Sequence, residues 1–119
     1  MGSSTYLCNG ETGEIIVPRL EVAYTVWQRV IGLIGRASLA DDEALWLHPC
    51  NSIHTLGVRF SIDVLFLDAQ GRVLQMRYGL QPCRICWPIW KAKTVVELPA
   101  GTLARSVIAL GTLIAVGEA

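Results

Sequence analysis

Hydrophobic and polar residues alternate over short distances along this chain, a pattern typical of strands joined by brief connections. The clearest element is "SIDVLFLD" at 61–68, a nearly continuous run of strand-forming residues. Such a run is typical of a strand covered on both faces. It is followed by "DAQG" at 68–71, which has the length and late glycine of a hairpin loop, and by the alternating "RVLQMRY" at 72–78. We therefore predict a β-hairpin whose second strand turns one face to the core.

Further strands are predicted on both sides of this hairpin. The segment "EIIVPRLEVAYT" at 14–25 is rich in strand formers, and Pro18 limits pairing in its middle. It therefore predicts two short strands or one bent edge strand. The segments "ALWLH" at 44–48, "TVVELP" at 94–99 and "GTLIAV" at 111–116 each predict one more strand.

Two segments show helical features instead. The first, "TVWQRVIGLIGR" at 25–36, has its apolar residues at helical spacing and carries a glycine near its end. The second, "AGTLARSVIAL" at 100–110, predicts a short helix that turns Leu103, Val107 and Ile108 inward. Together these patterns predict an α+β fold, a compact β-rich single domain with a mixed, partly barrel-like sheet and two or three short helices.

Length and composition narrow the class of protein. The 119 residues suit one domain with one core, and we assign residues 1–13 to an N-terminal tail and turn and residues 14–119 to that domain. A composition of 52% hydrophobic and 17% charged residues excludes a disordered chain. The net charge is zero, so we expect neither nucleic acid nor a membrane as a partner. Low repulsion between copies is compatible with a monomer or a weak homo-oligomer.

The chain as given predicts a cytoplasmic location. No apolar run reaches the roughly 20 residues that span a bilayer, and the first residues do not form a secretory signal. Export of a longer precursor is an alternative that the sequence leaves open. In the cytoplasm the four cysteines are expected to be reduced.

A polar cluster, "CNSIHT" at 50–55, precedes the clearest strand. Cys50 and His54, with Asp63 to orient the imidazole, could form the nucleophile and base of a small hydrolase. Asn51 and its neighbours could equally bind their own backbone in a turn. Asp63 lies beside an apolar run, where a carboxylate needs a partner, so we favour a structural role in which it bonds loop N–H groups or an arginine.

The pair Cys83 and Cys86 forms a Cys-x-x-Cys motif between prolines and tryptophans. Such a pair can bind zinc or cycle between thiol and disulfide, and Cys50 with His54 could complete a set of four zinc ligands. Because the set matches no recurrent zinc spacing and the motif does not open a helix, we expect no cofactor and no metal. A zinc or thiol-redox protein is kept as the third hypothesis.

Three segments in this order resemble one bacterial and archaeal family, domain of unknown function 192. They are "RVIGLIGR" at 29–36, the segment 54–74 with Ile62-Asp63 and the Asp68–Gly71 hairpin, and the segment 95–116 with "ELPAG". The resemblance implies a compact, strand-rich α+β fold without an assigned reaction. Many members carry Trp-Met at the place of His54 and Thr55, so a catalytic His54 would belong to a subgroup only.

These observations favour a ligand-binding or partner-binding module over an enzyme. We predict a groove formed by the loop 51–55, the loop around Trp87 and the segment 99–101, with a small molecule or a protein as its ligand. Trp87 and Trp90 lie beside two lysines and could stack on a ligand or, alternatively, cover the open end of the fold. The predicted binding residues are Asn51, His54, Thr55, Asp63, Trp87 and Glu97.

Overall fold

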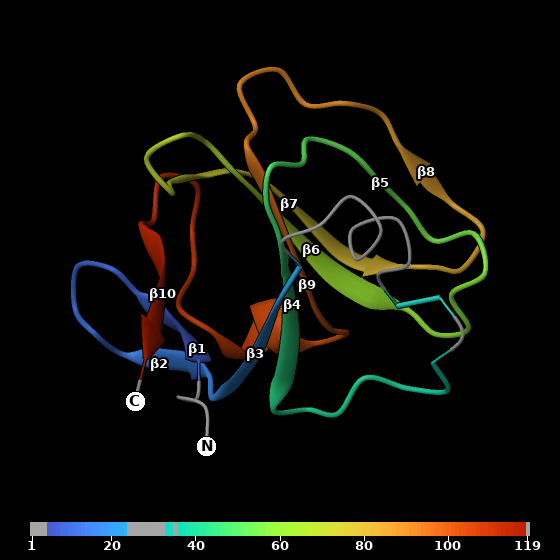
Figure 1. Ribbon diagram of the computed structural model, residues 1–119, viewed down its shortest axis with the longest axis horizontal. Helices are drawn as coiled ribbons and strands as arrows, with labels where there is room; N and C mark the ends of the chain where they lie inside the picture. Colours follow the sequence, from blue (N-terminus) through green and yellow to red (C-terminus); the bar gives the residue numbers. More distant parts are fainter. Residues whose placement is uncertain (1–4, 24–32, 35, 119) are drawn as a thin grey trace.

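The computed structural model describes residues 5–23, 33–34 and 36–118, which form a compact, β-rich unit with a radius of gyration of 13.0 Å (Figure 1). Its elements in chain order are β1 (Thr5–Asn9), β2 (Ile15–Val17), β3 (Arg19–Ala23), β4 (Glu43–Leu47), β5 (Ile53–His54), β6 (Ile62–Leu67), β7 (Val73–Leu80), β8 (Ile85–Cys86), β9 (Thr94–Pro99), α2 (Thr102–Arg105) and β10 (Ile114–Glu118).

The largest sheet has five strands in the order β3-β4-β9-β6-β7. The β3–β4 pair is parallel and the other three pairs are antiparallel, so the sheet is mixed. All residues of β6 are buried, as the apolar run at 61–68 predicted, and all residues of β9 are buried as well. The edge strands β3 and β7 do not pair with each other, so no closed barrel forms in the described residues. The barrel-like part of the predicted fold is therefore corrected.

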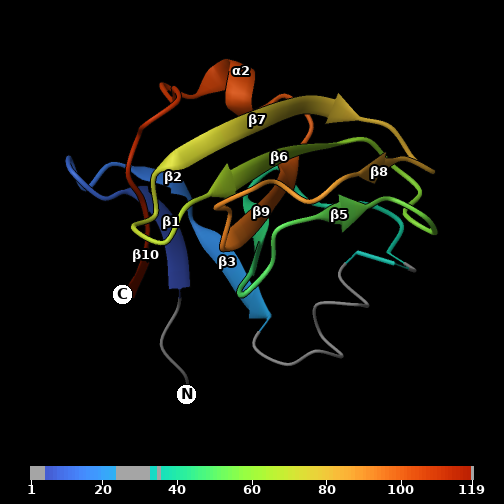
Figure 2. The same cartoon turned by 90° about the horizontal axis from the view of Figure 1, so that it is seen from above.

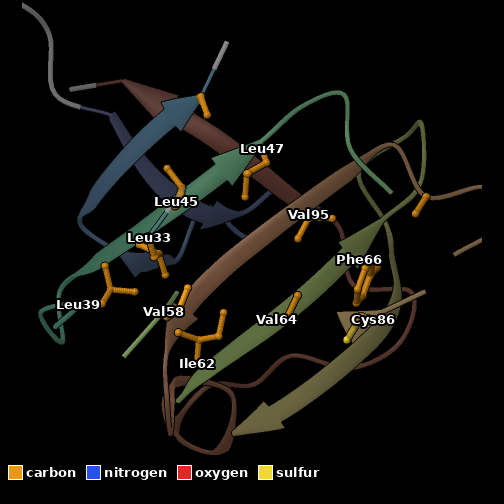
Figure 3. Packing of buried hydrophobic residues seen from close by; sticks show 12 residues of the cluster. Leu33, Leu39, Leu45, Leu47, Val58, Ile62, Val64, Phe66, Cys86 and Val95 are labelled. Carbon is orange, nitrogen blue, oxygen red and sulfur yellow. The ribbon is translucent and has the colours of Figure 1, made fainter. Parts of the chain in front are cut away.

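Each face of this sheet carries its own apolar cluster. The three-stranded sheet β10-β1-β2 and α2 cover one face, where Leu65 and Leu98 pack against Leu7 and Leu103. On the other face, Val64, Phe66 and Val95 share a cluster with Leu33, Val58 and Cys86, and the short β5–β8 ribbon contributes to this cover (Figure 3). The two views in Figures 1 and 2 place β5 and β8 at the end of the molecule away from the described termini.

Strand β1 lies in the segment that the sequence analysis assigned to a tail. It pairs with β10 on one side and β2 on the other, and its Leu7 is fully buried. Its partner β10 follows it by more than a hundred residues, so the short apolar pattern of β1 carries no local sign of the pairing. The turn at 9–13 does form, because the Asn9 side chain accepts the N–H groups of Glu11 and Thr12.

Helical structure in the described residues is limited to α2. The predicted helix at 25–36 lies almost entirely outside the described residues. After α2 the backbone of Ser106 is extended (φ −104°, ψ 155°), so Val107 is 92% exposed instead of facing inward as predicted. Pro18 separates β2 from β3, which enter different sheets, as the sequence predicted for two short strands. Within the described part of the chain, no helix has the length and apolar character to cross a membrane.

Candidate functional site

Asp63 is a buried anchor for backbone N–H groups. Its side chain is 1% exposed, and its carboxylate accepts the N–H groups of Gly79 (2.8 Å), Gly101 (3.1 Å) and Leu103 (2.9 Å). Charge-assisted bonds of this kind are stronger than bonds between neutral groups. The carboxylate therefore holds its own strand β6, the strand β7 and the start of α2 together.

The partners of Asp63 are groups that regular structure leaves unpaired. The β6–β7 register shifts between Ile62 and Val64, and Gly79 with φ +58° lies in the resulting β-bulge, where a ladder hydrogen bond is missing. Gly101, the N-cap residue of α2, supplies no side-chain cap for the helix. One carboxylate thus satisfies N–H groups at both places.

The predicted reaction centre is not assembled. The Cys50 Sγ donates to the carbonyl oxygen of Ser52 (3.0 Å), whereas His54 lies exposed on β5, opposite Ile85 of β8. Asp63 bonds backbone N–H groups. These hydrogen bonds join Cys50 and Asp63 to backbone groups, whereas acyl transfer requires a contact between nucleophile and base.

The Cys-x-x-Cys motif places its two thiols in different environments. Cys86 is buried in the apolar cluster, while Cys83 is exposed in a turn with φ 62°. Among the residues that the structure describes, no group of three or more histidine, cysteine, aspartate or glutamate side chains could hold a metal ion.

Thr55 stabilises the β5–β8 ribbon through hydrogen bonds of its buried side chain. It is fully buried; its hydroxyl donates to the carbonyl oxygen of Gln81 (2.6 Å) and accepts the N–H of Arg84 (2.8 Å). The backbone N–H of Thr55 also donates to the carbonyl oxygen of Arg84 (2.8 Å). Thr55 was predicted as a binding residue, but these bonds commit its polar atoms to the fold.

Glu97 lies in the middle of the five-stranded sheet, paired with Leu45 on β4 and Val64 on β6. Its side chain is 3% exposed, and no other described residue donates a hydrogen bond to its carboxyl group. Burial raises the pKa of Glu97 from 4.5 to about 8, although the positive charge of Arg36 acts in the opposite direction. The carboxyl group is therefore mostly neutral near pH 7.

A pocket of about 650 Å³ opens between three segments: Asn51, the hairpin loop 68–70 and the loop 88–93. Backbone hydrogen bonds fix its walls. The Ile89 N–H donates to the Asn51 carbonyl (2.9 Å), and the Lys93 N–H donates to the Leu67 carbonyl (2.7 Å). The loop 88–93 is thus tied both to the polar cluster and to the end of β6.

The polar side chains of this pocket are available to a ligand. Asn51, Gln70, Lys91 and Lys93 are exposed, and their side chains make no hydrogen bond or ion pair with another described residue. Asp68 is partly engaged, because its Oδ1 accepts the N–H groups of its own hairpin loop. Next to these groups stands the indole of Trp90, which is 84% exposed. The pocket therefore combines two ammonium groups, two amides and an aromatic plane.

The predicted groove forms only in part. The β5–β8 pairing brings the loop 51–55 against the loop that carries Trp87, as expected for two of its three segments. The third segment, 99–101, instead reaches Asp63 and α2. Trp87 does not line the pocket, and the hairpin loop 68–70 was missed as a wall. In the sequence, the hairpin loop is recognisable only as a turn. A turn motif does not show which other segment the loop faces.

Replacing Asp63 tests its anchoring role. We expect Asp63→Ala to lower the free energy of unfolding by at least about 3 kcal/mol, because three N–H groups lose their acceptor. Asp63→Asn should fall in between, since it keeps one acceptor oxygen. Urea unfolding measures both. The exposed Asp41→Ala is the control, and a loss from Asp63→Ala no larger than that of the control would contradict the role.

Glu97 should make stability depend on pH. A carboxyl group whose pKa is higher in the folded state stabilises the fold fully when the pH is below its unfolded pKa of 4.5. This contribution is lost as the pH rises through the folded pKa of about 8. We expect the urea midpoint of the wild type to fall between about pH 5 and about pH 8, and Glu97→Gln to reduce that fall. The same pH dependence in both proteins would show that Glu97 ionises normally.

The chain is similar to one known protein family and to a protein within it. The family DUF192, described as an "Uncharacterized ACR", matches residues 8–116. A UPF0127 protein of Thermococcus sibiricus is 28% identical over 102 residues, which are 82% of this chain and 65% of that protein. The chain therefore spans less than two thirds of this relative's length.

Two crystal structures share the fold. A protein of unknown function from Novosphingobium aromaticivorans has a TM-score of 0.77 at 22% identity, covering 93% of this chain and 82% of its own. A proposed transcription regulator from Sinorhizobium meliloti has a TM-score of 0.74 at 20% identity, covering 98% and 92%. At these identities the likeness shows the fold alone. Because the family match extends over nearly the whole chain, this protein belongs to the DUF192 family, to which no activity is assigned.

Proposed function

We propose that the protein is a binding module and that its ligand is a small molecule with an anionic group and a flat apolar part. The observation that carries this proposal is the pair Lys91 and Lys93, without an ion-pair partner among the described residues, beside the exposed Trp90 in a pocket of about 650 Å³. Pockets of this size are typical of small-molecule sites.

Each part of the ligand has a counterpart in the pocket. The two ammonium groups exceed the one carboxylate of the lining, Asp68, so the pocket favours a negative charge. The Trp90 indole offers a face for a ring. Asn51 and Gln70 can donate and accept hydrogen bonds and so fix the ligand's orientation.

The backbone of the loop supports a prearranged site. Lys91 has φ 72°, a conformation that is uncommon for a residue other than glycine and that persists only when the surroundings hold it. The Ala92 N–H bonds the Ile89 carbonyl (3.1 Å) on one side of it, and the Cys50 N–H bonds the Lys93 carbonyl (2.8 Å) on the other. A loop held in this way loses less conformational entropy on binding.

The alternatives have less support. A hydrolase that would use Cys50, His54 and Asp63 has less support because Cys50 and Asp63 bond backbone groups. A zinc or thiol-redox site has less support because the thiols of Cys83 and Cys86 lie in different environments. We further propose a cytoplasmic location, which the reduced thiols of Cys8, Cys83 and Cys86 support.

Naphthalene-1-sulfonate, a flat aromatic anion, is a suitable probe for this site. We expect saturable binding to the wild type, with amide NMR shifts centred on residues 68–70 and 88–93. The double variant Lys91→Gln/Lys93→Gln and the variant Trp90→Ala should each weaken binding by about tenfold, equivalent to about 1.4 kcal/mol. Neutral 1-naphthol should bind the wild type more weakly than the sulfonate does.

Arg105→Gln, which removes an exposed cation on α2, is the matched control and should leave the affinity unchanged. All these positions are exposed, so the melting temperature should change little. Equal affinity of all variants, or shifts centred on another part of the molecule, would refute the proposed site.

A further inference from the structure

The net charge of zero conceals a strong asymmetry along the chain. Residues 44–96 contain six arginines and lysines but two acids, Asp63 and Asp68, whereas residues 1–43 contain three basic and six acidic residues. Asp63 is buried and bonded to backbone N–H groups, so it contributes no exposed negative charge. The excess positive charge therefore belongs to the part of the chain that forms β5 to β9.

Much of this charge lies on the β5–β8 ribbon and its flanking loops. From here on, the ribbon means residues 51–59 and 81–93. Four exposed cations belong to it, and none of them forms an ion pair with a described residue: Arg59, Arg84, Lys91 and Lys93. Arg72 lies outside this ribbon and pairs with Glu11. The ribbon itself contains no aspartate or glutamate. It lies at the end of the molecule away from the described termini (Figures 1 and 2).

The same ribbon exposes large apolar side chains. Trp87 is 77% exposed, Trp90 is 84% exposed and Ile85 is 57% exposed, and Leu56 is exposed as well. Pairing joins the two segments of the ribbon, because Ile85 lies opposite His54 and Thr55 bonds Arg84. Single exposed hydrophobic residues are ordinary, but several on one cationic segment mark an interaction surface.

We propose that this ribbon docks on the anionic surface of a lipid bilayer. Tryptophan favours the membrane–water interface, where its ring lies at the level of the headgroups, and lysine and arginine are attracted to anionic lipids. Trp87, Trp90 and Ile85 enter the interface, while the cations contact the headgroups. Because the ribbon contains cations and no acidic residue, its charge favours a negative surface.

The aliphatic side chains favour a bilayer over a nucleic acid. Ile85 and Leu56 match hydrocarbon, whereas single-stranded nucleic acids are bound in positively charged grooves lined by stacking rings. The inference goes beyond the proposed pocket, because Arg84, Ile85 and Trp87 do not line it. It also departs from the expectation drawn from net charge, since an average over the whole chain says nothing about one surface.

Sedimentation with vesicles tests the docking. We expect the wild type to bind vesicles of equal parts phosphatidylcholine and phosphatidylglycerol, with a blue shift of tryptophan emission, and to bind pure phosphatidylcholine weakly. Trp87→Ser and Lys91→Glu should each weaken binding by about tenfold. Their matched controls are Val107→Ser and Arg105→Glu, exposed residues outside the ribbon, which should bind like the wild type.

Asn51→Ala separates this proposal from the small-molecule pocket, because it changes the pocket without removing a charge or a ring from the ribbon. It should retain vesicle binding. Three results would overturn the docking: equal binding of the ribbon variants and their controls, equal binding to neutral and anionic vesicles, or tighter binding to oligothymidylate than to the anionic vesicles.

Discussion

The buried carboxylate of Asp63 joins elements that the sheet alone would not hold together. It accepts N–H groups from the bulge in β7 and from the start of α2, while its own strand β6 lies between β9 and β7 in the largest sheet. Neither the sheet ladder nor the short helix offers an acceptor for these groups. Their satisfaction by one charged group fixes how β7 bends and where the chain turns after β9.

This constraint changes the meaning of the polar residues around it. In the polar cluster and the strand after it, Asp63 binds backbone, Thr55 braces the ribbon and Cys50 bonds its own loop. In these bonds the three side chains support the fold. The groups that do remain available, Asn51 and the aromatic, cationic loop 88–93, suit recognition of a ligand or a surface, which is why the proposals concern binding.

The sequence predicted what depends on local pattern. The hairpin of β6 and β7 and the two short strands around Pro18 follow from alternation and turn residues. It did not predict β1, whose pairing depends on a strand at the other end of the chain, or the exposure of Val107, which results from the early end of α2. Asp63 was expected to need an N–H partner, but its partners lie 16 to 40 residues away, and no local pattern specifies them. Likewise, no local pattern shows that the hairpin loop 68–70 lines the pocket.

Hydrogen exchange of individual amides, measured by NMR under native conditions, tests the role of Asp63 most directly. The N–H groups of Gly79, Gly101 and Leu103 lie at a bulge and at a helix start, where frayed structure would exchange quickly. If the carboxylate holds them, all three should exchange nearly as slowly as the amides of β6. Exchange as fast as that of Ala69, an exposed loop residue, would contradict the account.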